Sequence, residues 1–190
     1  MTNGTKVRKR SGSLETLDLN KMHKMVEEAC KDLAGVSASQ IEINSGIQFY
    51  DGVTTAEIQE ILIRSASDLI DLDTPNYQFV AARLLLFALR KQLWGRMHEY
   101  PSLVNHVQKC IDLNVYDREI VSKYSDEEWN KLDEYIDHDR DYLFTYAGLR
   151  QVADKYLVQD RSSGEVYETP QFMYCLLYTS PSPRDGTSSR

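Results

Sequence analysis

The sequence predicts a mostly α-helical protein that begins with a small β-hairpin. Apolar residues recur at three- and four-residue spacing through most of the chain, which is the period of a helix with one buried face. Ahead of these stretches, residues 6–18 alternate loosely between polar and apolar around Ser11-Gly12-Ser13. That pattern is typical of two short strands joined by a tight turn.

The composition is that of a globular protein. Of 190 residues, 42% are hydrophobic and 27% are charged, which is enough for a sizeable core. A formal net charge of -7 argues against a nucleic-acid coat, although a local basic site remains open because charge acts through its distribution. No nucleic-acid partner is therefore expected, and no membrane partner either, because no apolar run reaches membrane-spanning length.

The cysteines and histidines show no metal or disulfide pattern. Cys30, Cys110 and Cys175 lie far apart without a C-x-x-C motif, and the four histidines have no ligand spacing. We therefore expect no metal site, and we expect a reducing compartment, the cytoplasm.

Three helices are expected after the hairpin. Helical spacing over 22–33 ends at Gly35, which can adopt the left-handed conformation that terminates a helix. A second helix fits within 37–49. A third begins at Thr54, because Thr54 and Glu57 have the spacing of a capping box, in which each side chain satisfies a free backbone donor of the other.

The fourth helix, over 77–93, is apolar almost all round and is therefore predicted to be buried. Its polar exceptions include Arg83, Arg90 and Lys91, which share a face by the three-and-four rule. We expect them to form a short cationic ridge near the end of this helix.

Beyond a boundary near Gly95, shorter elements are expected. The acidic segment 137–141 is interpreted as a helix start, where carboxylates favour the helix dipole, and not as a metal or acid-base site. The expected elements are helices over 102–113, from a Ser125–Glu128 cap and over 141–156, a hairpin over 157–167, and a helix starting at Pro170.

Residues 175–190 do not continue the helix that begins at Pro170. They switch to Ser, Pro and Arg without apolar periodicity. One choice of codons for this stretch resembles the end of a transposase-type sequencing adapter, so we interpret 175–190 as a non-native tail and the natural chain as truncated near Tyr174. A natural disordered tail is the alternative.

The turn of the first hairpin carries Lys9 and Arg10 side by side in an acidic chain. A strand-turn-strand can present both cations to one phosphate group, because Arg forms forked bonds to its oxygens and Lys supplies a point charge. If the phosphate belongs to a purine nucleotide, Glu15 can accept a hydrogen bond from an amino group of the base. Lys91 can supply a third cation. The alternative is an exposed hairpin with ordinary surface charges. The Gly-rich phosphate-binding motifs are absent.

Four ordered blocks together resemble the start of the large (alpha) subunit of class I ribonucleoside-diphosphate reductase. They are VRKRSGSLETLDLNK at 7–21, SGIQFYDGVTT at 45–55, PNYQFVAARLLLFALRK at 75–91, and the segment from YIDHDRDYLF to TPQFMY at 135–174. The resemblance implies an ATP-cone helical domain over 1–95, followed over 96–174 by the helical start of the reductase catalytic domain.

The resemblance also implies a site for ATP and dATP as allosteric effectors, with Mg²⁺. It assigns phosphate contacts to four residues and base and ribose contacts to a continuous run. These residues are Lys9, Arg10, Thr55 and Lys91 for the phosphates, and Glu15, Thr16, Leu17, Asp18, Leu19, Asn20 and Lys21 for the nucleoside.

Three positions depart from the family pattern. Asp18 replaces a common asparagine, and Gln59 and Ala88 each replace a common histidine. Asp18 still accepts hydrogen bonds but has no amide donor, Gln59 cannot be cationic, and Ala88 offers neither charge nor hydrogen bond.

By resemblance, the parent enzyme reduces ribonucleotides to deoxyribonucleotides for DNA synthesis through cysteine radical chemistry. Its partners are a radical-generating small subunit and a second alpha subunit. The catalytic cysteines lie downstream of the residues matched here, so this chain is expected to contain no catalytic residue and to be inactive alone. Two alternatives are a helical interaction domain without nucleotide binding and a free-standing ATP-cone regulator, although the zinc ribbon of such regulators is missing.

Overall fold

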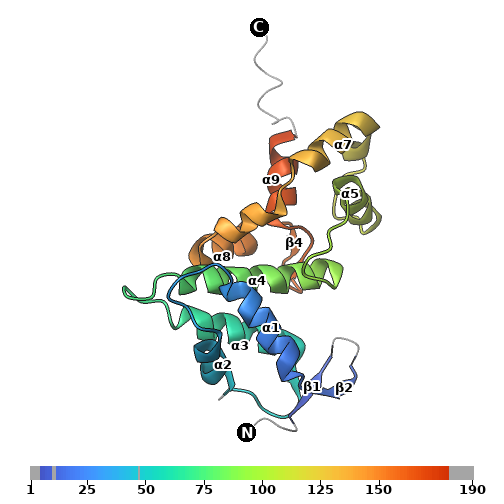
Figure 1. Ribbon diagram of the computed structural model, residues 1–190. Coiled ribbons are helices and arrows are strands. Elements are labelled where there is room, and N and C mark those ends of the chain that lie inside the picture. The colour runs from blue at the N-terminus through green and yellow to red at the C-terminus, as the bar shows by residue number, and fades with distance from the viewer. Residues whose placement is uncertain (1–4, 10–11, 47, 180–190) are drawn as a thin grey trace. The chain divides into compact units, whose positions relative to one another are not determined.

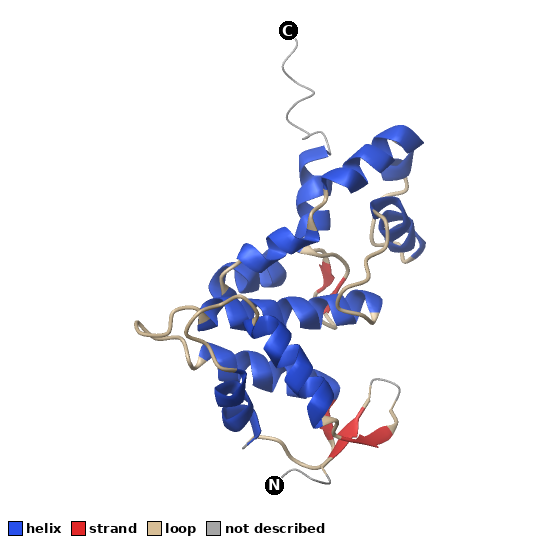
Figure 2. Ribbon diagram, viewed as in Figure 1, coloured by secondary structure: helices blue, strands red, loops and turns tan. Residues whose placement is uncertain are grey.

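The computed structural model describes residues 5–9, 12–46 and 48–179 and confirms a mostly helical chain with a small N-terminal sheet (Figures 1 and 2). The strands are β1 (Lys6–Arg8), β2 (Leu14–Thr16), β3 (Val53–Thr54), β4 (Gln159–Asp160) and β5 (Glu165–Val166). The helices are α1 (Leu19–Cys30), α2 (Ala38–Gly46), α3 (Thr55–Ser67), α4 (Tyr77–Trp94), α5 (Leu103–Asp112), α6 (Glu119–Ser122), α7 (Asp126–Tyr135), the 3-10 helix η1 (His138–Leu143), α8 (Tyr146–Lys155) and α9 (Pro170–Thr179).

The chain divides into two compact units. The first unit contains Met1–Leu89 and Tyr142–Gln151, and the second contains Arg90–Asp141 and Val152–Arg190. The chain therefore leaves the first unit within α4 and returns to it for ten residues before leaving again within α8. The expected domain boundary at 95/96 stays a prediction.

The first unit contains a three-stranded sheet of order β2-β1-β3. The predicted hairpin is confirmed, with β1 antiparallel to β2. The third strand was not predicted. It pairs parallel to β1, Val7 with Val53 and Arg8 with Thr54. A two-residue strand has no alternation to detect, and the sequence here predicts only the helix cap at Thr54.

The first three helices start and stop for local reasons. The Asp18 side chain caps α1, and Thr54 with Glu57 forms the predicted capping box of α3. Helix α1 ends at Cys30, earlier than the periodicity predicted, because Lys31 leaves the helical conformation and Asp32 adopts a φ of 60°. Its apolar face packs in the core of the unit with residues of the sheet, α2 and α3, including Val7, Val26, Ala29, Ile41, Val53 and Leu62.

Helix α4 is buried as predicted, but its arginines do not form a cationic ridge. Arg90 is fully buried in the second unit. Its guanidinium donates to the Tyr100 hydroxyl and the His138 carbonyl, both at 2.7 Å, and contacts an Asp141 carboxylate oxygen at 3.4 Å. A buried charge requires such partners. Asp141 therefore turns inward and lies in η1, and the helix predicted over 141–156 begins only at Tyr146.

The second unit has a core cluster built from α5, α7 and α9. Ser125 and Glu128 form the predicted capping box of α7. The predicted break at Cys175 is wrong, because α9 runs to Thr179 and the side chains of Cys175 and Leu176 pack against this cluster. The cluster consists of Leu103, Val107, Ile111, Trp129 and Phe172.

Among the described residues, no helix is both long enough and apolar enough to cross a membrane. Nor does this part of the chain contain a group of three or more His, Cys, Asp or Glu side chains arranged to hold a metal ion.

One prediction concerns His106, which is buried on α5 with its ring against Phe172 and Trp94. Burial lowers the pKa of His106 to about 4, and nearby Lys109 adds to the effect. A depressed folded-state pKa means that the unfolded chain binds the proton first. The stability that depends on a neutral His106 is therefore fully present above pH 6.5 and is lost as the pH falls from 6.5 towards 4, by roughly 3 kcal/mol.

We expect the urea midpoint, followed by tryptophan fluorescence, to fall below pH 6.5 and His106→Phe to reduce that fall. Trp94 and Trp129 both lie in the second unit and are the only tryptophans, so the signal reports on this unit. His98→Phe at an exposed histidine is the matched control. An identical pH dependence in wild type and His106→Phe would contradict the prediction.

Candidate nucleotide site

The parallel pairing of β1 with β3 brings two predicted phosphate ligands to one edge of the sheet. Arg8 pairs with Thr54, so the next residues along each chain, Lys9 and Thr55, lie at the same end of the ladder. Thr55 is also the first residue of α3, a helix of 13 residues. The start of a helix carries the positive end of the dipole, so this edge places a lysine near a helix terminus whose capping box already engages the backbone NH and the carboxylate of Glu57.

The hairpin holds Lys9 opposite another predicted ligand. The Lys9 ammonium lies 3.0 Å from the Glu15 carboxylate, with both side chains substantially exposed, at 39% and 55%. The backbone NH of Lys9 donates to the Ser13 carbonyl at 2.9 Å, and Gly12 closes the turn with a φ of 83°. An exposed pair of this kind contributes less than about 1 kcal/mol, so a phosphate can replace the carboxylate at small cost. Arg10 lies outside the described residues.

The predicted nucleoside-binding run, 15–21, passes from β2 directly into the first turn of α1 (Figure 1). The backbone NH of Leu17 donates to the Thr5 carbonyl at 2.9 Å, which ties the run to the residue just before β1. An Asp18 carboxylate oxygen accepts from the backbone NH of Lys21 at 3.1 Å. This hydrogen bond, with the charge of Lys21, lowers the pKa of Asp18.

At the N-cap, an aspartate such as Asp18 is as effective as the asparagine that is common at this position in the family. This departure therefore leaves the start of α1 intact, although one carboxylate oxygen is already occupied. Of the other departing positions, Gln59 and Ala88 are both half-buried in the first unit.

Lys91 belongs to the second unit. The predicted site residues that the structure describes in the first unit are Lys9, Glu15–Lys21 and Thr55, and the role of Lys91 stays a prediction.

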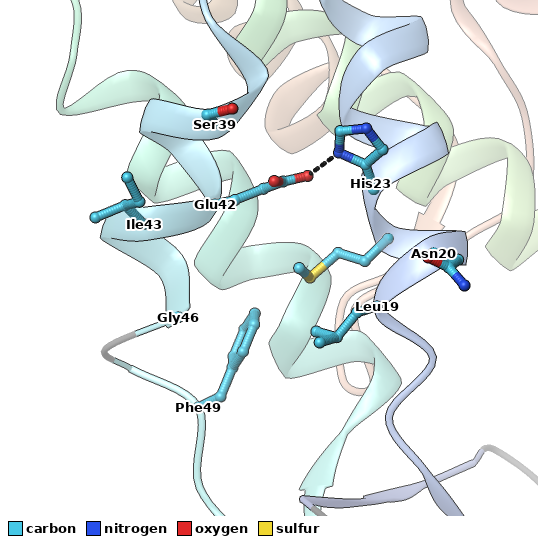
Figure 3. A pocket seen from close by; sticks show the side chains of 9 residues that line it. Leu19, Asn20, His23, Ser39, Glu42, Ile43, Gly46 and Phe49 are labelled. Atoms are coloured by element: carbon cyan, nitrogen blue, oxygen red, sulfur yellow. Dashed lines mark hydrogen bonds and ion pairs between the residues drawn. The ribbon is translucent and has the colours of Figure 1, made fainter. Parts of the chain in front are cut away.

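A pocket of about 350 Å³ lies between α1 and α2 (Figure 3). Two predicted residues, Leu19 and Asn20, line it. The sequence reasoning missed its other members, although His23 follows Leu19 and Asn20 by four and three residues and so shares their helix face. These further lining residues are Met22, His23, Ser39, Glu42, Ile43, Gly46 and Phe49.

The pocket suits an apolar group better than a phosphate. Leu19 and Phe49 point into it from two segments (Figure 3), and Ile43 lies at its rim. Its charged lining is acidic, because Glu42 faces it and no lysine or arginine is among the described residues that line it. Lys9 and Thr55 are not among the residues that line this pocket, and Lys9 supplies a cation where the pocket's described lining has neither lysine nor arginine.

His23 links α1 to α2 beside this pocket. Its Nδ1 lies 2.7 Å from the Glu42 carboxylate and its Nε2 lies 3.1 Å from Glu27 (Figure 3 shows the first contact). These contacts raise the pKa of His23, chiefly through the hydrogen bond with Glu42. The folded-state pKa is raised, so the contribution to stability is complete below pH 6.5 and is lost as the pH rises through the folded value.

We therefore predict that the His23 ring titrates above 6.5 when followed by NMR of its ring protons. Glu42→Gln should lower this pKa more than Glu27→Gln, because Glu42 is the main cause of the shift. The reverse order, or a pKa at or below 6.5 in the wild type, would show that the α1–α2 contact is not an ion pair in solution.

Known proteins match the part of the chain that carries this geometry. The ATP cone domain family matches residues 5–92. The chain is 47% identical over 171 residues to ribonucleoside-diphosphate reductase 1 subunit alpha of Escherichia coli. It is 44% identical over 180 residues to the subunit alpha of Haemophilus influenzae, and 42% identical over 168 residues to that of bacteriophage T4.

These alignments cover 90%, 95% and 87% of this chain but only 22%, 24% and 22% of the relatives, so the chain spans less than a quarter of their length. The chain is therefore similar to ribonucleoside-diphosphate reductase alpha subunits over less than a quarter of their length, and its residues 5–92 match the ATP cone domain family.

Proposed function

We propose that the first unit binds ATP and dATP as regulatory effectors of a ribonucleoside-diphosphate reductase. The observation that carries this proposal is the pairing of β1 with β3, which places Lys9 beside the first residue of α3 within the ATP-cone domain. The whole protein would reduce ribonucleotides to deoxyribonucleotides for DNA synthesis, together with a radical-generating small subunit and a second alpha subunit.

The phosphates would lie at the edge formed by Lys9 and the start of α3. Lys9 would exchange the Glu15 carboxylate for phosphate oxygens, which accept stronger, charge-assisted hydrogen bonds. Thr55 would contribute its hydroxyl and its place in the first turn of α3. Mg²⁺ would arrive as its complex with the triphosphate, because this ion keeps several waters and is commonly held through nucleotide phosphates.

The nucleoside would lie along the run from β2 into α1. Glu15, freed from Lys9, would accept from the amino group of the base, and Leu17 would pack against the ring. Lys21 stands in the first turn of α1, 3.6 Å from an Asp18 carboxylate oxygen, and can balance the added negative charge.

Regulation requires that ATP and dATP make different contacts, because a ligand shifts an equilibrium only by its differential affinity for the two states. The two nucleotides differ at the ribose 2′ position. Asp18 keeps a carboxylate oxygen that can accept from a 2′-hydroxyl, while Gln59 and Ala88 supply no positive charge. We therefore infer that discrimination in this chain depends on Asp18 and its neighbours.

We predict that ATP and dATP bind saturably in calorimetric titration and that Lys9→Ala weakens both by about tenfold or more, as expected for a lost charge-assisted contact. Lys24→Ala is the matched control, because it removes the same charge from the exposed face of α1. Equal losses in the two variants would indicate only a general charge effect. A folded sample that binds neither nucleotide would favour the alternative, a helical interaction domain with a solvated hairpin.

A further inference from the structure

The C-terminal end of α1 is held by a side chain of α4. Nη1 of Arg83 donates to the carbonyl of Lys31 at 2.6 Å and to that of Ala29 at 3.2 Å. The last carbonyls of a helix have no partner within the helix, and a cation there also offsets the negative end of the dipole. Because the chain turns away at Lys31 and Asp32, Arg83 substitutes for the missing helical donors.

The same guanidinium lies over the ring of Tyr142, with its Cζ 5.3 Å from the ring centroid. Tyr142 also packs edge-on against Phe87, with ring centroids 6.3 Å apart and planes at 80°. Tyr142 opens the segment 142–151, which belongs to the first unit although it follows the residues of the second. The far end of this segment is tied to α3, where Arg150 lies 3.5 Å from Glu60.

We propose that Arg83 is a positioning residue that couples the nucleotide site to the segment 142–151. The inference rests on the proposed function. Helix α1 has 12 residues, about 18 Å, with Asp18 at the nucleotide end and the Arg83-bound carbonyls at the other. A short helix moves as one body, so a nucleotide that orders its first turn also restricts its last turn. Arg83 transmits that restriction to Tyr142.

The coupling is reciprocal by linkage. If nucleotide binding orders 142–151, then contacts that order 142–151 tighten nucleotide binding by the same factor. This segment joins residues 90–141 to residues 152 onwards, both in the second unit. How well ordered this connecting segment is would thus depend on whether a nucleotide is bound to the first unit.

The loop after α1 does not depend on Arg83 alone. The Asn76 side chain donates to the Ala34 carbonyl at 2.8 Å, and the Tyr77 hydroxyl accepts from the backbone NH of Ser37 at 2.9 Å. A variant at Arg83 therefore keeps the α1–α2 connection anchored, and it removes the link to Tyr142 without removing the fold.

Hydrogen exchange with mass spectrometry on the full 190-residue chain, with and without ATP, tests the proposal. ATP should slow exchange in peptides from 15–21 and also in peptides from 142–151. Arg83→Leu should keep the first effect, lose the second and weaken ATP binding about fivefold, at the lower end of typical coupling. Arg83→Lys, which keeps the charge, should restore part of the slowed exchange at 142–151 and part of the ATP affinity.

Tyr142 supplies the matched pair of variants. Tyr142→Phe keeps the ring face and should behave as wild type, whereas Tyr142→Leu removes the ring and should behave as Arg83→Leu. Slower exchange at 15–21 without change at 142–151, or unchanged coupling in Arg83→Leu, would overturn the role of Arg83 while leaving the proposed function standing. No slowing at 15–21 in a folded sample would overturn both.

Discussion

The pairing of β1 with β3 is the constraint on which the geometry of the first unit depends. It consists of only two residues on each strand, but both valines, Val7 and Val53, are buried, and a one-residue shift would expose them. The Lys6 carbonyl accepts from the Gly52 NH at 2.8 Å and the Lys6 NH donates to Asp51 at 2.8 Å, so two further hydrogen bonds fix the register just before the paired residues. Since Thr54 also caps α3, this register sets which residue after β1 lies beside the start of that helix.

The second unit depends on a different interaction, the burial of Arg90. Its partners come from the loop after α4 and from η1, so satisfying one charge orders several otherwise irregular segments. Burial raises the pKa of Asp141 to about 6, while the Gln171 side chain and Arg90 oppose that rise. Removing one partner of a buried ion pair is strongly destabilising, because it leaves the other charge buried without compensation.

Features with a local cause were predictable from the sequence, whereas those that need a distant partner were not. The capping boxes at Thr54 and Ser125 satisfy backbone groups within one turn, so their spacing alone predicts them. The strand β3 exists only because β1 lies beside it. The inward turn of Asp141 exists only because Arg90 is buried nearby. Likewise the extension of α9 beyond Tyr174 follows from the packing of Cys175 and Leu176 and leaves no periodicity to detect.

The candidate site divides in the same way. The adjacent cations and the run 15–21 were visible as charge and motif, but the nearness of Lys9 to Thr55 and the Lys9–Glu15 pair depend on strand register. The pocket between α1 and α2 depends on how two helices pack, which sequence period does not report.

The return of residues 142–151 to the first unit has a consequence for the order of synthesis. At about 5–20 residues per second, the ribosome adds residues 90–141 in roughly three to ten seconds. During that interval the sheet and α1–α4 are already made, but the segment that carries Tyr142 and Arg150 is not. The surfaces around Phe87 and Glu60 stay uncovered until that segment emerges. The N-terminal domain of the nascent chain is therefore completed by residues that follow most of its neighbour, and the two units finish folding in an interleaved order.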